Sequence, residues 1–220
     1  SDLTEISYGV VGSAPNRAYV ISWHVVPNYE FNEITHDFQI VLYEGTNDVE
    51  IYNAGHPDLN GYNMTVGIAS EDCEGMGPYE SSSEAWFGGK WTFSSDDSNG
   101  YTMEVEATGQ QVTPTYAFGT FPVDTDLSDS DDDYAEVTLP FTFTFYGRDY
   151  DVIDISTNGS ISFDAEWGDD YDAYDFDEYC TDMVLGAHTD LDPEASDLTE
   201  ISYGVVGSAP NRAYVISWHV

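Results

Sequence analysis

The chain has 220 residues, of which 41% are apolar and 15% aromatic, so it can bury a real core and a disordered chain is not expected. It carries 42 acidic residues against 4 Lys and Arg, a formal net charge of −38, which excludes nucleic acid or an anionic membrane as partners held by charge. No run of 18 apolar residues is present, so no membrane insertion is expected in this segment.

Residues 1–25 return letter for letter at 196–220, an offset of 195 residues. A period this long means that the repeated unit is a whole domain. The second copy stops at Val220, inside an apolar run that the first copy continues through Val26 and Pro27. We expect one period plus an overlap from a tandem array. The alternative is separate protomers whose end segments complete a neighbour's sheet by strand addition. Both predict identical modules assembled head to tail.

Short strands follow one another along the whole chain, and no stretch of ten residues has a helical period. Asn-Gly pairs at 60, 99 and 158 mark turns between them. This spacing predicts an all-β fold, a β-sandwich or a jelly roll. The expected strands lie near 17–26, 38–42, 48–53, 62–69, 91–94, 101–107, 137–145, 151–157, 160–164, 182–188 and 200–206.

An acidic segment, DTDLSDSDDD, occupies 124–133. Ca²⁺ takes six to eight oxygen ligands, which closely spaced carboxylates on a loop supply. The segment lacks the glycine and final glutamate of an EF-hand, and a solvated acidic loop is the alternative. A salty environment that screens the charge is a further explanation of the acidity. The candidate Ca²⁺ ligands are Asp124, Asp126, Ser128, Asp129, Asp131 and Asp133.

A second acidic segment, 164–178, interleaves carboxylates with Trp167, Tyr171, Tyr174 and Phe176. This pattern fits a cation site, a face on which sugars stack, or an insert that covers a sheet edge. Asp190 and Asp192 could join either acidic cluster.

Signals for catalysis are weak. With 42 acids, a pair of nearby carboxylates of the glycosidase kind arises by chance. The histidines have no metal-binding spacing, and no nucleophile elbow or phosphate loop occurs. We therefore expect a protein that is not an enzyme. The triplets at Asn63 and Asn158 are candidate N-glycosylation sites.

Two stretches carry a resemblance to a known family. LPFTFTFYGRDYDVIDISTNGSISF (139–163) resembles the first half of nidogen-like β modules of secreted proteins and large bacterial surface proteins. NRAYVISWHVV (16–26), HDFQIVLYEGTNDVEIYNAG (36–55) and MTVGI (64–68) resemble the second half. The resemblance implies an extracellular, architectural or adhesive module without catalytic residues.

The order of the two halves is reversed relative to that family. Residues 1–107 would then be the C-terminal part of one β module and 108–220 the N-terminal part of the next, out of phase with the chain ends. The junction is expected near 107–114.

Cys73 and Cys180 are expected to form disulfides, because an extracellular setting is oxidising. The family order implies that Cys180 pairs with the Cys73 of the next copy, at 73 + 195 = 268. A direct Cys73–Cys180 bond, which would overturn the boundary near 110, and two free thiols are the alternatives.

The function expected from the sequence is that of a structural subunit of an extracellular tandem-repeat fibre or surface stalk. Such a subunit would assemble head to tail with identical modules and be stabilised by Ca²⁺ and glycosylated. The alternative is a cell-surface adhesin or a carbohydrate-binding module, with glycans as partners.

Overall fold

The computed structural model describes residues 6–29, 34–55, 63–80, 88–96, 98–106, 112–117, 130–164, 170–176, 178–195, 200–208 and 211–219. Within these ranges every regular element is a strand except one short 3₁₀ helix. No helix of the described residues is long and apolar enough to cross a membrane. The elements are β1 (Ile6–Ser13), β2 (Asn16–Pro27), β3 (Thr35–Tyr43), β4 (Val49–Asn53), β5 (Met64–Ala69), β6 (Gly75–Met76), β7 (Tyr79–Glu80), β8 (Gly89–Ser95), β9 (Tyr101–Glu106), β10 (Tyr134–Phe145), β11 (Arg148–Ser156), β12 (Ser160–Ser162), β13 (Met183–His188), η1 (Pro193–Ala195), β14 (Glu200–Ser208) and β15 (Asn211–His219).

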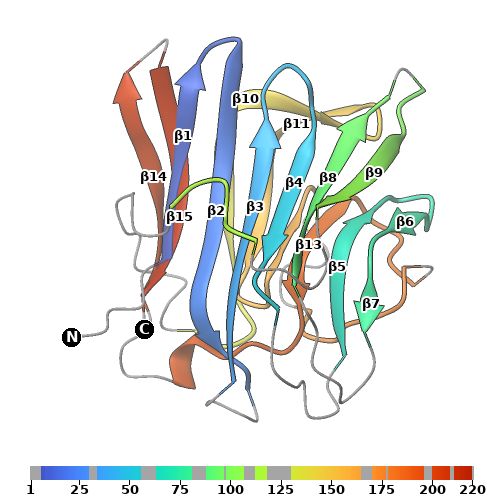
Figure 1. Ribbon diagram of the computed structural model, residues 1–220, viewed down its shortest axis with the longest axis vertical. Coiled ribbons are helices and arrows are strands. Elements are labelled where there is room, and N and C mark those ends of the chain that lie inside the picture. The colour runs from blue at the N-terminus through green and yellow to red at the C-terminus, as the bar shows by residue number, and fades with distance from the viewer. Residues whose placement is uncertain are drawn as a thin grey trace.

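The strands form two antiparallel sheets that pack face to face (Figure 1). The first sheet has the order β14-β15-β1-β2-β3-β4-β8-β9. The second has the order β10-β11-β12-β13-β5-β6, and β7 also pairs with β5. The predicted all-β sandwich is therefore confirmed.

The core lies between the sheets, where the alternation of the strands places their aromatic residues. Phe143 and Phe145 of β10 are buried, whereas Thr142 between β10's core-facing residues is exposed. Phe163 stacks on both phenylalanines, with ring centroids 5.8 and 4.6 Å apart. From the first sheet, Trp23 stacks on Phe38 at 4.6 Å. Burial of such large aromatic side chains is the main stabilising contribution to a sandwich of this kind.

The segments 1–107 and 108–220 complete one another in this sandwich. β5, from the first segment, pairs with β13, from the second, through Ala69↔Met183 and Ile68↔Val184. Asn53 also donates its side-chain amide to the carbonyl of Gly186 at 3.1 Å. The second sheet is thus built from both segments, which the sequence had assigned to two neighbouring modules. Strand pairing therefore crosses the expected boundary near 107–114.

The outer face of the first sheet is covered by residues 112–117, which cross in front of β2 and β3 (Figure 1). Gln39 points to this side and is fully buried. Its side-chain amide donates to Ser22 Oγ at 2.7 Å and to the carbonyl of Tyr116 at 3.2 Å. Its oxygen accepts the N–H of Tyr116 at 3.2 Å. A polar side chain in the middle of a strand is therefore satisfied by the chain that covers it.

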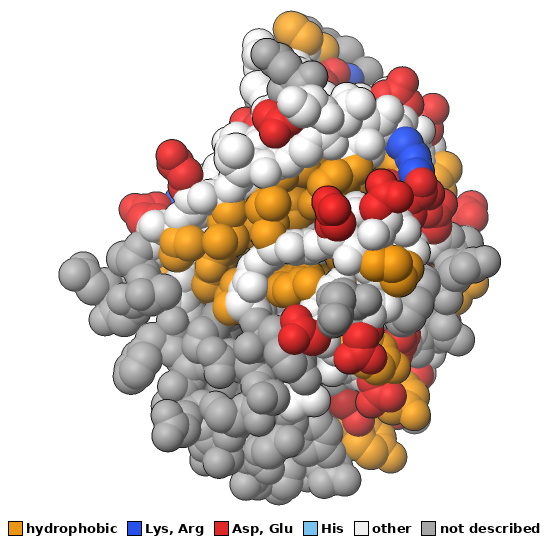
Figure 2. Space-filling view, turned by 90° about the vertical axis from the view of Figure 1, so that its right-hand side faces the viewer, with side chains coloured by type: hydrophobic (Ala, Val, Ile, Leu, Met, Phe, Trp, Pro, Cys, Tyr) orange, Lys and Arg blue, Asp and Glu red, His pale blue; other side chains and the backbone are white. Residues whose placement is uncertain are grey.

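The surface is strongly acidic. Figure 2 shows acidic side chains around an apolar band on one side of the molecule. The three basic side chains that the structure describes are held by acids: Arg17 by Glu44, Lys90 by Glu50 and Glu106, and Arg148 by Glu71. These ion pairs neutralise only a small part of the formal charge of −38.

Candidate functional site

Three carboxylates meet at one end of the second sheet. Asp131 and Asp132 precede β10, and Asp190 follows β13. One oxygen of each lies within 4.8 Å of an oxygen of the other two. Carboxylate oxygens gathered from two loops are the donor set that a hard cation such as Ca²⁺ takes. We refer to Asp131, Asp132 and Asp190 as the acidic cluster.

Asn158 ties the two loops of the acidic cluster together. It is fully buried in the turn between β11 and β12. Its amide nitrogen donates to Asp132 Oδ1 at 2.9 Å, and its oxygen accepts the N–H of Leu191 at 2.8 Å. Asp132 itself has a φ of 49°, a left-handed conformation that aspartate tolerates better than most residues. The carboxylate of Asp132 is thus held in place by its own backbone and by Asn158.

The backbone of Asp190 is fixed from the other sheet. Its carbonyl accepts the side-chain amide of Asn28 at 3.0 Å and the N–H of Tyr29 at 3.2 Å. An isolated bridge between Asn28 and Leu191 continues this contact. The end of β2 therefore positions one carboxylate of the acidic cluster.

The acidic cluster is electrostatically costly when it is fully ionised. Partial burial, and then the nearby charges of Asp132, Asp131, Asp192 and Asp172, raise the pKa of Asp190 to about 7. His188 close by does not offset this charge, because complete burial lowers its pKa to about 4 and keeps it neutral. The arrangement therefore favours a proton or a cation at Asp190.

A pocket of about 230 Å³ opens beside the acidic cluster. Its walls are Tyr29, Tyr171 and the three carboxylates. The tyrosine side chains are 48% and 46% exposed, so their ring faces are accessible. Aromatic rings next to carboxylates can hold a cation or stack against a sugar.

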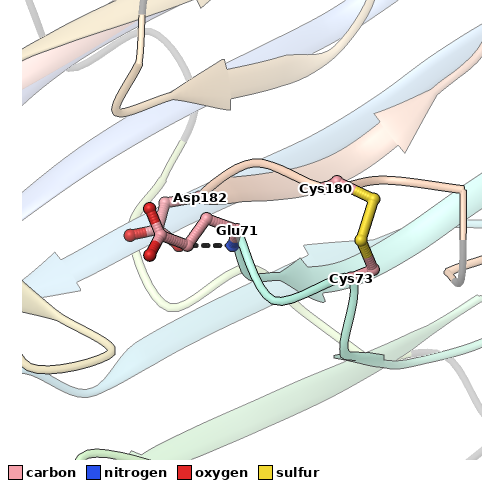
Figure 3. Close-up of a disulfide and its surroundings, with 4 residues drawn as sticks. All are labelled: Glu71, Cys73, Cys180 and Asp182. Carbon is pink, nitrogen blue, oxygen red and sulfur yellow. Dashed lines mark hydrogen bonds between the residues drawn. A yellow bond between two sulfur atoms is a disulfide. The ribbon is translucent and has the colours of Figure 1, made fainter.

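A disulfide joins Cys73 to Cys180 within this chain, with Cα atoms 4.1 Å apart (Figure 3). The expectation of a bond to the next copy's Cys73 is therefore wrong for this structure, and the direct bond speaks against the boundary near 110 that the family order implied. The reason is the register of β5 and β13. Ala69 lies opposite Met183, so the chain leaving β5 and the chain entering β13 run side by side as far as the two cysteines. The two cysteines are 107 residues apart in the sequence, and that separation did not indicate that they would lie side by side.

Asp182 forms a second link beside the disulfide. It accepts the N–H of Glu71 at 3.0 Å, as Figure 3 shows, and the hydroxyl of Tyr150 at 2.7 Å. Arg148 pairs with Glu71 and lies 3.7 Å from Asp182. Burial nonetheless raises the pKa of Asp182, against the lowering effect of the Tyr150 hydrogen bond and of the Arg148 charge. The disulfide, the hydrogen bonds of Asp182 and the Arg148–Glu71 ion pair thus join segments 1–107 and 108–220 at one place.

Comparison with known families matches the sequence model of the family described as NIDO related to two stretches, residues 2–116 and 110–220. Together they cover almost the whole chain. The chain belongs to the NIDO-related family. Its two NIDO-related stretches meet at 110–116, next to the segment that crosses the first sheet. NIDO-related domains are modules of an extracellular type, and two of them in succession confirm the nidogen-like resemblance. Searches of curated proteins and of solved structures gave no match.

The NIDO-related sandwich brings together only part of the predicted cation site. Asp131 belongs to the acidic cluster. Asp133 does not, because its carboxylate accepts the N–H of Tyr134 at 2.8 Å and its backbone pairs with Thr157. Asp132 was missed, since the prediction had chosen mainly alternating residues and nothing in the sequence signalled its left-handed backbone. The other predicted ligands, Asp124, Asp126, Ser128 and Asp129, lie outside the described residues.

The glycosylation site predicted at Asn158 is wrong for the folded chain. Asn158 and Ser160 are both fully buried, and both ends of the Asn158 amide are used in hydrogen bonds. The Asn-Gly pair at 158 forms the turn between β11 and β12, and the glycosylation triplet occurs there only because of this turn sequence. Asn63, which precedes β5, is half-buried, and glycosylation at that residue stays a prediction.

The second acidic segment, 164–178, has two roles in the NIDO-related fold. Tyr174 and Phe176 pack against Tyr179, Met183 and Leu185 on the outer side of the second sheet. The hydroxyl of Thr65 on β5 donates to the carbonyl of Tyr174 at 2.7 Å. This part covers the sheet, whereas Tyr171 stays exposed at the pocket. Trp167 lies outside the described residues.

Proposed function

We propose that this chain is a repeating structural subunit of an extracellular fibre or surface stalk, assembled head to tail from identical modules. The observation that carries the proposal is the perfect repeat of 25 residues at an offset of 195. A repeat without a single difference joins copies of one unit, and the unit here is an extracellular type of NIDO-related module. An all-β module of this family is a structural rather than a catalytic type of domain.

The packing of the two segments supports an array of this kind. Each 195-residue period contains one disulfide pair and the strands β1–β13 of the two sheets. A chain of such periods would consist of covalently linked, individually closed units. Disulfides are stable in an oxidising environment, so such units suit the outside of a cell.

The acidic cluster supports a role for Ca²⁺ in this assembly. Asp131, Asp132 and Asp190 would supply three of the six to eight oxygens that Ca²⁺ takes, and water or backbone carbonyls would supply others. A bound cation would also remove the repulsion that raises the pKa of Asp190. One such site in each repeat would relieve part of the large negative charge of a fibre.

Electron microscopy of the surface material from native cells tests the fibre proposal, with antibodies against the 195-residue repeat as labels. We expect unbranched fibres labelled at regular intervals along their length. Labelling of single domains tethered to the cell, without fibres, would contradict the proposal and favour an adhesin.

A cell-surface adhesin or carbohydrate-binding module is the second candidate. It is favoured by the pocket in which Tyr29 and Tyr171 lie beside the acidic cluster, since exposed aromatic rings provide stacking faces for sugars. Binding of the purified chain to an array of glycans in the presence of Ca²⁺ tests it. Binding that is lost in Tyr171→Ala and kept in Tyr134→Ala, another exposed tyrosine that does not line the pocket, would support this function.

A further inference from the structure

The strand β9 (Tyr101–Glu106) lies at one edge of the first sheet. Among the strands that the structure describes, it pairs only with β8. Figure 1 places β9 near the right-hand border of the molecule, and Figure 2 looks onto that side, where an apolar band is bordered by acidic side chains. The free side of an edge strand presents backbone N–H and C=O groups to which another extended chain can bond.

One face of β9 is apolar and only partly covered. Successive side chains of a strand point to opposite faces, so Met103 and Val105 lie on the same face as Tyr101. Tyr101 is buried and its ring centroid lies 5.3 Å from that of Phe145 on β10, so this face looks towards the second sheet. Met103 and Val105 nevertheless stay 41% and 45% exposed. The sandwich thus leaves part of the inner face of β9 open to further apolar side chains.

The other face of β9 is acidic. Glu104 and Glu106 lie on it, and both are exposed. Like charges that face each other destabilise a strand pair, so these two residues oppose the addition of an acidic strand, a second β9 included. A strand with Lys or Arg at the facing positions gains attractive pairs instead. The acidic face therefore selects the kind of strand that can be added.

β8 shows which kind of strand β9 accepts on its paired side. Val105 lies opposite Trp91 on the apolar face. On the acidic face Glu106 lies opposite Lys90, and the two side chains form an ion pair at 3.4 Å. β8 thus offers apolar residues to one face of β9 and a basic residue to the other. A strand with the same distribution of side chains suits the free side.

No segment of this chain has that distribution. The whole sequence contains four basic residues, Arg17, Lys90, Arg148 and Arg212, and no two of them are spaced two residues apart. A strand that presents two basic side chains on one face needs that spacing. The formal charge of −38 likewise favours a partner with positive charge over a second copy.

We propose that the free edge of β9 binds an extended segment of another protein in which Lys or Arg alternates with apolar residues. The apolar side chains of the segment lie beside Met103 and Val105, and its basic side chains lie beside Glu104 and Glu106. The backbone of the segment extends the first sheet by one strand. This surface goes beyond the proposed function, because it recruits a basic partner whether or not the chain forms a fibre.

Calorimetric titration of the 220-residue chain with a short synthetic peptide of alternating lysine and valine tests the proposal. The control is a peptide of the same composition in which the lysines and the valines form separate blocks. We expect the alternating peptide to bind about tenfold more tightly, because only alternation places both kinds of side chain on the matching faces of β9. Equal affinities, or no binding of the alternating peptide, would overturn the proposal.

Two charge reversals locate the site of binding. Glu104→Lys and Glu136→Lys change the net charge equally, and both residues are exposed on edge strands, Glu136 on β10 of the second sheet. We expect Glu104→Lys to weaken binding of the alternating peptide about tenfold, because an attractive cross-strand pair becomes a repulsive one. Glu136→Lys should bind as the wild type does. Equal weakening in the two variants would mean that the peptide responds only to the overall charge, and the proposal fails.

Amide hydrogen exchange of the wild-type chain provides a readout that needs no variant. An added strand forms backbone hydrogen bonds with the edge that it joins. The alternating peptide should therefore slow exchange in Tyr101–Glu106 and leave exchange in Tyr134–Phe145, the edge strand β10, unchanged. Slower exchange in β10 alone, in both strands equally or in neither would contradict strand addition at β9.

Discussion

The amide nitrogen of Asn158 donates a 2.9 Å hydrogen bond to the carboxylate of Asp132. Asn158 belongs to the Asn-Gly turn between β11 and β12, a part of the fold that resembles nidogen-like modules, and Asp132 belongs to the acidic segment that precedes β10. The contact joins a turn of the sandwich to the acidic cluster. It explains how a cation site could be built on an architectural module without changing the core.

Replacing Asn158 by alanine should lower the stability of the chain. The substitution leaves the N–H of Leu191 without its side-chain partner in a buried place and removes the support of Asp132. Such a loss costs about 1–3 kcal/mol. Urea unfolding of Asn158→Ala measures it, with Asn63→Ala, the other asparagine of a glycosylation triplet, as the control. If both variants unfold at the same urea concentration as the wild type, the role given to Asn158 is wrong.

Ca²⁺ should raise the melting temperature of the chain at constant ionic strength. Binding to the native state alone adds about 2.7 kcal/mol at a free concentration one hundred times the Kd, which corresponds to roughly 5–10 °C for a domain of this size. Calorimetry with chelator and with Ca²⁺ measures the shift. We expect Asp190→Asn and Asp132→Asn to lose most of it. Asp133→Asn should keep it, because Asp133 lies outside the acidic cluster.

If Ca²⁺ raised the melting temperature equally in all three variants, or did not raise that of the wild type, no specific Ca²⁺ site would be present. Screening by salt would then be what reduces the repulsion between the acidic residues.

The stability of the metal-free chain should fall as the pH rises from the ordinary aspartate pKa to about 7, because of Asp190. Its pKa is raised to about 7 in the folded chain, so the folded state holds the proton more tightly than the unfolded state does. The stabilisation is complete below the ordinary aspartate pKa and is lost as the pH passes 7. Urea unfolding from pH 5 to 8 in chelator should therefore show a decline that Asp190→Asn reduces. The wild type and the variant would have parallel profiles if Asp190 titrated normally.

Because of His188, the stability of the chain should fall as the pH is lowered, which is opposite to the effect of Asp190. Burial lowers the pKa of His188 to about 4, so the folded state resists protonation. The corresponding stability is present above the ordinary histidine pKa of about 6.5 and is lost as the pH falls through 4. In Asp190→Asn, where the other titration is absent, unfolding between pH 7 and 4 should reveal this loss. An NMR signal assigned to His188 that titrates near 6.5 in the folded chain would contradict it.

The sequence predicted the sandwich well because its strands alternate cleanly. Phe141, Phe143 and Phe145 face the core as the pattern indicates. Gln39 shows the limit of such reasoning: it alternates with core residues and should face water, yet residues 112–117 cover it. A covering segment is a long-range contact, and local periodicity carries no information about it.

The candidate site was predicted only in part, for the same reason. Asp131 was among the predicted ligands, whereas Asp190 was named only as able to join either acidic segment. It lies almost sixty residues further on and joins Asp131 through the topology of β10 and β13. The sequence predicted that Cys73 and Cys180 form disulfides, but it did not favour a bond between these two residues. Family order implied a partner in the next copy, whereas the pairing of β5 with β13 brings Cys73 and Cys180 together in one chain.

Removing the disulfide should strongly destabilise the sandwich. The bond closes a loop of 107 residues between the two segments, for which loop entropy gives about 4–5 kcal/mol. Urea unfolding of the double variant Cys73→Ser/Cys180→Ser measures the loss. A monomeric chain that runs faster on a gel without reductant than with it would verify the internal bond. Disulfide-linked multimers in its place would mean that Cys73 and Cys180 pair between chains.

A cryo-electron microscopy map of native surface fibres tests the central claim most directly, that this chain is the repeating unit of an extracellular fibre. The account predicts a continuous fibre in which one two-sheet module of 195 residues recurs along the axis, with Cys73 and Cys180 bridged within each module. Surface fibres built from a different chain, or native material that contains this protein only as isolated globular domains, would contradict it.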